Sequence, residues 1–385
     1  MMYKLAETSS WVLLTTTRYS QLYKTPNNRC VKVTAVVGLN KPYNSKKELE
    51  ILKKLSSSNE NMNNCIHLFT EQSGIEKGNV ILVMPYISKS LLNYLYEFWK
   101  DKQGKRKFNP YLLLNNDNTN TNTTTDNKNN ENLQEFKNTI STDLALDIIK
   151  QLANGLNFIH SNGIIHRDVN LSNVLVEQIS IGDKVTIKYI DFGISYDVNE
   201  ENKDEPADNK VTDVSTSKYK APELLFSVKN YDYKIDVWSL MVIISQISRV
   251  VATNENLSSC IIPSFIDDGT EISPITGKFL SQGSDISLIM SIFSELGMPK
   301  LQDWPSVKKY GSLAFEGMFG SEGDGKYIFE GNGDDYSLLD RLKKFFPLFE
   351  HHEKLLLISF LPMLHLEPTK RSSSAELLET LNLHT

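Results

Sequence analysis

Two short polar motifs contain the residues whose types and spacing are suited to catalysis. Asp168 and Asn173 lie in the first motif, and the second, Asp191-Phe192-Gly193, begins 18 residues after Asn173. Phosphoryl transfer requires a carboxylate that positions or deprotonates the attacking hydroxyl group, and oxygen ligands for the magnesium ions that neutralise a triphosphate. Asp168 suits the first task, and Asn173 and Asp191 suit the second. A predicted strand ends just before Asp191, and Gly193 is expected to permit the turn behind it.

Longer motifs around these residues resemble a known family. His166-Arg167-Asp168 and Asp191-Phe192-Gly193 are followed by Ala221-Pro222-Glu223 and Asp236-Val237-Trp238-Ser239, in the order and spacing typical of eukaryotic protein kinases. The resemblance implies an α+β fold with a small β-rich N-lobe and a larger α-helical C-lobe. It also implies a Ser/Thr protein kinase that uses ATP and Mg2+. The alternative is a solvated loop with incidental carboxylates, which the joint match disfavours.

A lysine and a glutamate far upstream are predicted to form an ion pair. Lys32 lies in the predicted strand 30–36, and Glu48 lies on the apolar stripe of a predicted helix that has Pro42 in its first turn. A glutamate on a buried face needs a cationic partner, and Lys32 is the candidate. In the kinase family such a lysine contacts the α- and β-phosphates. The alternatives are a solvated lysine and a capping box of Glu48 with Ser45.

The resemblance also assigns the residues around the adenine ring. Adenine is expected to pack between Leu22 and Leu175, with Met84 as the gatekeeper. The Pro85 carbonyl and the Ile87 backbone are expected to form the hinge hydrogen bonds. Proline lacks an N–H group but keeps the carbonyl acceptor that this position needs.

Two departures from the family affect the phosphate-binding end of the site. Thr15, Thr17 and Ser20 stand where the family has glycines, which allow backbone N–H groups to approach a phosphate closely. Asn170 stands where the catalytic loop normally has a lysine that stabilises charge on the transferred phosphate. The loss of such a cation predicts a cost of roughly 2.7–4 kcal/mol in the transition state. Lys218 is a candidate substitute.

Three further contacts follow from the resemblance. Thr216 is expected to bond to Asp168 and to help orient the substrate hydroxyl group. Glu223 is expected to form a buried ion pair with Arg371. Asp236 is expected to brace the backbone of the catalytic loop from its helix.

The activation segment, residues 191–223, lacks the residue that this branch of kinases usually phosphorylates. Arg167 usually pairs with that phosphate, but the corresponding position is Val211, which has no hydroxyl group. Six carboxylates lie in the middle of the segment: Glu200, Glu201, Asp204, Glu205, Asp208 and Asp213. We hypothesise that one of them occupies the place of the phosphate. A solvated acidic loop is the alternative.

The elements that position these residues fall into two parts. Apolar and β-branched runs predict strands at 10–16, 21–25, 30–36, 67–71, 79–84 and 185–190, and helical spacing predicts helices at 42–55, 144–160, 237–247 and 285–296. This pattern predicts an N-lobe of residues 1–87 and a C-lobe of residues 88–385. Residues 115–132 contain nine Asn and five Thr and no aliphatic or aromatic residue, which predicts a disordered insertion.

Composition narrows the partners and the compartment. The 385 residues include 41 Lys+Arg and 47 Asp+Glu, a formal net charge of −6, which argues against a nucleic-acid coat protein. The longest apolar stretch is shorter than the roughly 20 residues that span a bilayer. Three widely spaced cysteines form neither a disulfide framework nor a CxxC metal site. We expect no nucleic-acid or membrane partner, and a cytoplasmic protein that also enters the nucleus.

Motifs in the C-lobe resemble the cyclin-dependent-kinase branch. Gly297-Met298-Pro299 and Trp304-Pro305 follow the predicted helix 285–296 as in that branch, and Ile190–Asp197, Asp236–Gln246 and Gly317–Tyr327 are similar to the single-subunit fungal kinases that activate cyclin-dependent kinases. This implies a cell-cycle kinase that phosphorylates the activation-loop threonine of cyclin-dependent kinases, as a monomer with no obligate cyclin and without activating phosphorylation of its own. The alternatives are another Ser/Thr kinase of this branch and a pseudokinase scaffold.

Overall fold

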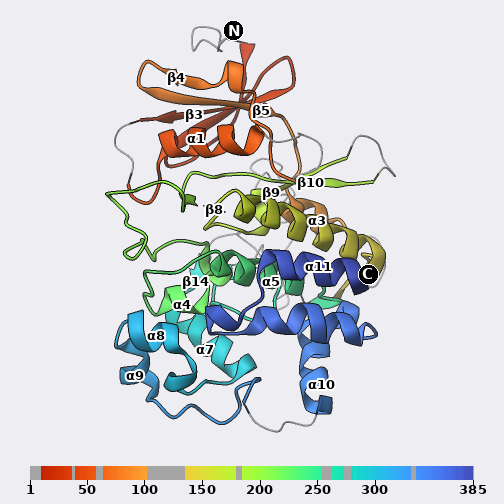
Figure 1. The fold of residues 1–385 in the computed structure, drawn as a ribbon. Helices are drawn as coiled ribbons and strands as arrows, with labels where there is room; N and C mark the ends of the chain where they lie inside the picture. Colours follow the sequence, from red (N-terminus) through yellow and green to blue (C-terminus); the bar gives the residue numbers. More distant parts are fainter. Residues whose placement is uncertain are drawn as a thin grey trace, which may run out of the picture.

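The chain forms a small sheet-rich lobe above a larger helical lobe (Figure 1). The computed structural model describes residues 10–36, 40–57, 64–101, 135–178, 184–253, 262–272, 279–281, 283–330 and 335–384. The predicted insertion at 115–132 lies outside the described residues. The upper lobe's last strand ends at Pro85, and the first helix of the lower lobe begins at Leu91.

Five antiparallel strands form the sheet of the upper lobe, in the order β1-β2-β3-β5-β4. They are β1 (Val12–Thr16), β2 (Ser20–Lys24), β3 (Arg29–Ala35), β4 (Gly74–Glu76) and β5 (Asn79–Pro85). Lys32 pairs with Leu22 of β2 on one side and with Leu82 of β5 on the other. The lysine is therefore fixed in the central strand of the sheet.

The helix α1 (Ser45–Ser56) lies under this sheet (Figure 1) and begins later than predicted. Its N-cap is Asn44, whose side chain accepts a hydrogen bond from the backbone N–H of Lys47 at 3.1 Å. An asparagine satisfies one of the helix's unpaired N–H groups, so the prediction that Pro42 lies in the first turn is wrong. The alternative capping box between Ser45 and Glu48 does not form either. Glu48 is buried, as the apolar stripe predicted.

The strand predicted at residues 67–71 does not exist. The backbone N–H groups of this region bind three different places: Ile66 donates to Tyr189, Leu68 to the Ser56 hydroxyl group, and Phe69 to Val83. A strand needs a continuous ladder of hydrogen bonds to one partner strand. The strand β4, later in the sequence, has such a ladder with β5. A short apolar run in the sequence does not show whether its backbone will pair with one strand or with several separate partners.

The three other predicted helices are present in the helical lobe. The helices α3 (Thr142–Ser161) and α5 (Lys234–Ile247) extend the predicted ranges, and α7 (Asp285–Leu296) matches its prediction. The other α-helices among the described residues are α2 (Leu91–Tyr96), α4 (Pro222–Leu225), α8 (Pro305–Tyr310), α9 (Ala314–Phe319), α10 (Asp335–Phe345) and α11 (Ser374–His384). Helix α11 lies beside α3 (Figure 1), and α5 is buried along almost its whole length.

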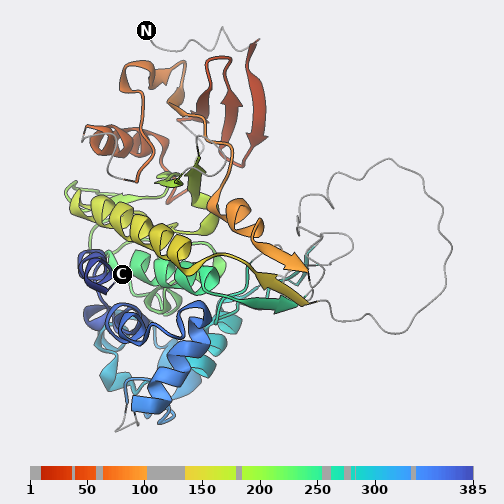
Figure 2. The ribbon, with the colours of Figure 1, turned by 90° about the vertical axis from the view of Figure 1, so that its right-hand side faces the viewer.

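Small antiparallel ladders at the top of this lobe hold the catalytic motifs. Strand β9 (Val174–Glu177) pairs with β10 (Thr186–Tyr189), and β8 (Ile164–Ile165) pairs with β11 (Tyr196–Asp197). A third sheet, from β6 (Trp99–Asp101), β7 (Glu135–Asn138) and β12 (Val251–Thr253), projects from the side of the lobe (Figure 2). A last pair joins β13 (Glu271–Ile272) to β14 (Phe279–Ser281).

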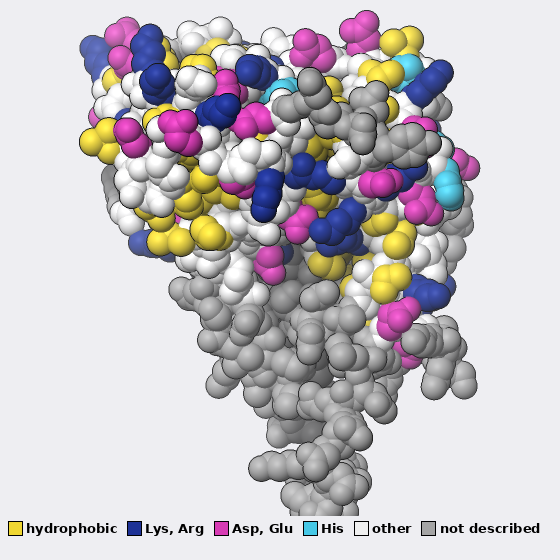
Figure 3. All heavy atoms as spheres, turned by 90° about the horizontal axis from the view of Figure 1, so that it is seen from below, with side chains coloured by type: hydrophobic (Ala, Val, Ile, Leu, Met, Phe, Trp, Pro, Cys, Tyr) yellow, Lys and Arg dark blue, Asp and Glu magenta, His cyan; other side chains and the backbone are white. Residues whose placement is uncertain are grey.

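The surface at the end of the helical lobe is chemically mixed. Basic, acidic and hydrophobic side chains are interspersed on this face (Figure 3). Scattered hydrophobic side chains of this kind are common on protein surfaces. Among the described residues, no helix is both long and apolar enough to cross a lipid bilayer.

The predicted ion pair between Glu223 and Arg371 is present and fully buried. The two guanidinium nitrogens of Arg371 donate to the two carboxylate oxygens of Glu223 at 2.8 and 2.9 Å. Arg371 also donates to the carbonyl groups of His365, Leu366 and Lys234. The pair therefore ties the end of the activation segment to α5 and to the segment before α11.

Substitution of Arg371 should strongly destabilise this lobe. Arg371→Met leaves the Glu223 carboxylate buried without a partner, and we expect the free energy of unfolding to fall by about 3–5 kcal/mol in urea titrations. The matched control is Lys343→Met, which breaks an exposed 3.0 Å pair with Glu353 and should cost less than about 1 kcal/mol. Equal losses in the two variants would contradict the assignment.

Candidate active site

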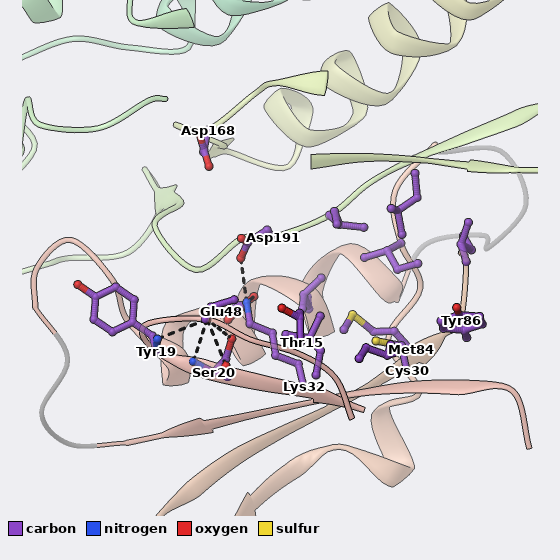
Figure 4. A pocket seen from close by; sticks show the side chains of 18 of the residues that line it. Thr15, Tyr19, Ser20, Cys30, Lys32, Glu48, Met84, Tyr86, Asp168 and Asp191 are labelled. Carbon is purple, nitrogen blue, oxygen red and sulfur yellow. Dashed lines mark hydrogen bonds and ion pairs between the residues drawn. The ribbon is translucent and has the colours of Figure 1, made fainter. Parts of the chain in front are cut away.

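Lys32 binds two carboxylates that come from different parts of the chain (Figure 4). Its ammonium group lies 2.7 Å from Glu48 of α1 and 2.8 Å from Asp191, which follows β10. The predicted pair of Lys32 with Glu48 is therefore confirmed as a contact. Burial opposes the charge on Lys32, but Asp191 and Glu48 outweigh it and raise its pKa well above the usual value. Lys32 in turn lowers the pKa of Asp191, so the carboxylate is ionised at neutral pH.

Four hydrogen bonds fix the Asp168 carboxylate. One oxygen accepts from the Thr216 hydroxyl group at 2.7 Å, from the Thr216 backbone N–H at 3.2 Å and from the Asn170 amide at 3.0 Å. The other accepts from the Asn173 amide at 2.7 Å. The predicted contact between Thr216 and Asp168 is confirmed. All of these donors are neutral, so they orient the carboxylate without supplying a charge.

Asp236 holds the backbone of the catalytic loop, as predicted. Its carboxylate accepts from the backbone N–H groups of His166 at 2.7 Å and Arg167 at 2.9 Å. It also contacts the His160 ring nitrogen at 3.0 Å. Arg167 has a φ of 69°, a conformation that non-glycine residues rarely adopt. The buried carboxylate stabilises this turn, which presents Asp168 to the pocket.

The residues predicted to contact the nucleotide line one pocket of about 450 Å³ between the lobes. Leu22, Met84, Pro85, Ile87 and Leu175 lie there together with Lys32, Glu48, Asp168 and Asp191. In Figure 4, Met84 and Tyr86 lie at one end of the pocket and Tyr19 lies at the other. The apolar end suits a flat ring, and the charged end suits phosphates.

Asn173 and Asp191 are the residues that would hold magnesium. Carboxylate and amide oxygens are suitable ligands, and Mg2+ commonly takes only one or two of them from the protein while water and substrate phosphates supply the rest. The described residues contain no group of three or more His, Cys, Asp or Glu that could hold a metal ion. One carboxylate and one amide are a donor set of the kind that Mg2+ takes from a protein when phosphates supply further ligands. A bound magnesium ion would neutralise charge on the phosphates.

Hydroxyl groups stabilise the loop that replaces the usual glycines. The Thr17 side-chain oxygen accepts from the backbone N–H of Ser20 at 3.0 Å and from that of Tyr19 at 3.4 Å. The Thr17 backbone also donates to the Ser20 carbonyl at 2.8 Å. These internal bonds occupy backbone donors that a glycine loop offers to phosphate. The loop is closed on itself instead.

Tyr43 is a site residue that the sequence did not reveal. Its ring stacks on Tyr19 with a centroid distance of 4.8 Å, and its hydroxyl group donates to Glu48 at 3.3 Å. Burial raises the pKa of Tyr43 to about 12. Gly193 was expected to permit a turn, but the left-handed residue is Asp191, with a φ of 65°. Gly193 makes room for Tyr43, because a Cβ atom there would lie 2.3 Å from its ring.

One of the six acidic residues in the middle of the activation segment contacts Arg167. The Glu205 carboxylate accepts from the Arg167 guanidinium group at 2.6 Å and from the backbone N–H of Val211 at 2.9 Å, through the same oxygen. Both side chains are buried, and the Tyr196 hydroxyl group donates to the Glu205 carbonyl at 3.2 Å. A carboxylate of the chain itself therefore forms an ion pair with Arg167, as hypothesised. The sequence could not select Glu205 from its neighbours.

The charges that act on Lys218 come from Asp267 and Asp268. The lysine is buried, and its desolvation lowers the pKa of its ammonium group, an effect that Asp267 and Asp268 oppose. These acidic neighbours lie outside the nucleotide pocket. Its suggested role as a substitute for the missing lysine stays a prediction from the sequence.

The two lobes and the pocket between them have the protein kinase fold. The family model of the protein kinase domain matches residues 19–259. The chain belongs to the protein kinase family. Membership in this family implies the use of ATP.

The relatives of the chain include a CAK1 kinase and a cyclin-dependent kinase. It is 35% identical to the serine/threonine-protein kinase CAK1 of Saccharomyces cerevisiae, over 86% of this chain and 84% of that protein. It is 29% identical to cyclin-dependent kinase 7 of Caenorhabditis elegans, over 43% of this chain and 39% of that one. The protein is thus a Ser/Thr kinase related to CAK1 and to the cyclin-dependent-like kinases.

Solved structures share the fold at low identity. The CAK complex of Chaetomium thermophilum bound to ATP-γ-S matches with a TM-score of 0.57 and 18% identity, covering 97% of this chain and 91% of that one. The yeast RNA polymerase II CTD kinase CTDK-1 complex matches with a TM-score of 0.56 and 20% identity, covering 98% and 94%.

The tight contact between Gly193 and Tyr43 can be tested with alanine. We expect Gly193→Ala to push the ring away from Glu48, at a cost of about 1–3 kcal/mol, and to lower kcat for phosphorylation of a protein substrate. Gly317→Ala is the matched control, because a Cβ atom there meets nothing within 4 Å. The loss should shrink when Tyr43 is also alanine. An undiminished loss in the double variant would show that the contact is not its cause.

Proposed function

We propose that this kinase transfers the γ-phosphoryl group of ATP to a threonine in the activation loop of a cyclin-dependent kinase. The observation that carries the proposal is the 35% identity to CAK1 across most of both chains. The motifs IDFGISYD and DVWSLMVIISQ, which suggested this branch, lie at the centre of the site and in α5. Another Ser/Thr kinase of the branch is the alternative.

The proposed roles follow from the geometry of the pocket. Asp168 would accept or orient the proton of the attacking threonine hydroxyl group, and Thr216, 2.7 Å away, would help to position that hydroxyl. Lys32 would contact the α- and β-phosphates while Glu48 holds it in place. Asn173 and Asp191 would supply the oxygen ligands for magnesium.

Transfer of phosphate to a purified cyclin-dependent kinase tests this proposal. Wild-type protein should label the activation-loop threonine, and Asp168→Asn should lower kcat by several orders of magnitude, since it loses the carboxylate that takes the proton. Replacement of the target threonine with alanine in the substrate should abolish labelling. Labelling of other proteins alone would support the alternative kinase. No transfer by the wild-type protein would favour the pseudokinase scaffold, which the absence of a lysine at position 170 also motivates.

We also propose that the kinase needs no activating phosphorylation. Glu205 lies where a phosphate would otherwise pair with Arg167, and it also binds the backbone of Val211, the position that lacks a hydroxyl group. A single buried carboxylate thus connects the catalytic loop to the activation segment. Independence from a cyclin, a monomeric state, and location in the cytoplasm and nucleus stay predictions from the sequence.

Unphosphorylated protein made in bacteria should therefore be active. Glu205→Gln keeps the shape of the side chain but removes its charge, and loss of a charge-assisted hydrogen bond of about 1.5–3 kcal/mol should lower kcat roughly tenfold or more. Glu201→Gln is the matched control, because Glu201 is an exposed carboxylate of the same segment. Inactive protein that a second kinase activates by phosphorylation would contradict the proposal.

A further inference from the structure

The end of the pocket that receives the phosphates is short of positive charge. Asn170 takes the place of the usual lysine, and its amide group is fully engaged. Its nitrogen donates to the Asp168 side chain at 3.0 Å, and its oxygen accepts from the backbone N–H groups of Ser172 and Asn173 at 2.9 and 3.1 Å. Asn170 therefore positions Asp168, but it brings no cation to the transferred phosphate.

Only two cationic side chains line the described pocket, against three carboxylates. The first, Lys32, already pairs with Glu48 and Asp191. The second is Arg18, at the turn between β1 and β2. Among the residues that the structure describes, no carboxylate lies within ion-pair distance of Arg18. Its guanidinium carbon lies over the Tyr19 ring, 5.3 Å from the ring centroid.

The loop that carries Arg18 is held in place over the pocket. Thr17 and Ser20 close the turn on both sides of it, and Tyr19 stacks on Tyr43, which itself bonds to Glu48. The turn is thereby anchored to the same ion cluster that holds Lys32. An arginine at such a site presents a fork of N–H donors that matches phosphate oxygens.

We propose that Arg18 binds the terminal phosphate of the nucleotide and supplies the positive charge that Asn170 does not. The inference rests on the proposed kinase function and adds a catalytic residue to it. The Thr17 side chain occupies backbone N–H donors of the loop. The Arg18 guanidinium group, rather than the backbone, would therefore contact the phosphate. A charge that stabilises the transferring group acts mainly in the transition state.

Nucleotide binding separates this inference from the identity of the protein substrate. Calorimetry with MgATP and MgADP should show that Arg18→Gln weakens ATP binding about tenfold and ADP binding much less, whereas Arg18→Lys is intermediate. Lys77→Gln, which removes an exposed charge from the β4–β5 turn outside the pocket, is the matched control and should change neither. Equal weakening of ATP and ADP, or no weakening of either, would overturn the proposal even if no substrate were phosphorylated.

Turnover gives a second, independent test. Arg18→Gln should lower kcat for phosphotransfer by roughly 10²-fold, as expected for removal of one electrostatic stabiliser. Addition of Asn170→Lys to Arg18→Gln should restore at least tenfold of that loss, because it returns a cation to the transferred phosphate from the other lobe. Rates within twofold of wild type for Arg18→Gln would refute the assignment. Failure of the wild-type protein to phosphorylate a cyclin-dependent kinase would instead refute the proposed substrate.

Discussion

The ammonium group of Lys32 is the point on which the rest of the site depends. It lies between Glu48 of α1 and Asp191 of the lower lobe, at 2.7 and 2.8 Å. Lys32 and Glu48 are almost completely buried, so either charge alone would be costly. The carboxylates stabilise the charge of this buried lysine when α1 is docked and Asp191 faces inward. Electrostatics thus couples the sheet, the helix and the start of the activation segment.

Two side chains of this protein stand where kinases commonly have a phosphate or a glycine. Glu205 provides the anion on Arg167, and Thr17 provides the acceptor that shapes a loop without glycine. Tyr43 connects that loop to Glu48. These contacts lie within one polypeptide and need no modification to form. The contacts of Tyr43 support the ion cluster of Lys32 from the side of this loop.

The sequence predicted those parts of the site that depend on one residue in a fixed motif. Asp168, Asn173 and Asp191 follow from motif spacing, and Glu48 follows from helical periodicity. The start of α1 was missed because Pro42 and Asn44 are both good helix-start residues, and only the side-chain bond to Lys47 decides between them. Tyr43 was missed because its contacts with Tyr19 and Gly193 join segments far apart in the sequence, which periodicity cannot show.

The loop at the phosphate end shows how one substitution constrains another. Glycines leave backbone N–H groups free to approach phosphates, whereas Thr17 binds those of Tyr19 and Ser20 itself. A loop closed in this way gains rigidity but loses donors, so side chains must make the contact. On the opposite side of the same phosphate, Asn170 stands where the catalytic loop normally has a cationic lysine. A side chain with a free positive charge on the loop, such as Arg18, is consistent with both changes, since it returns a donor and a charge in one group.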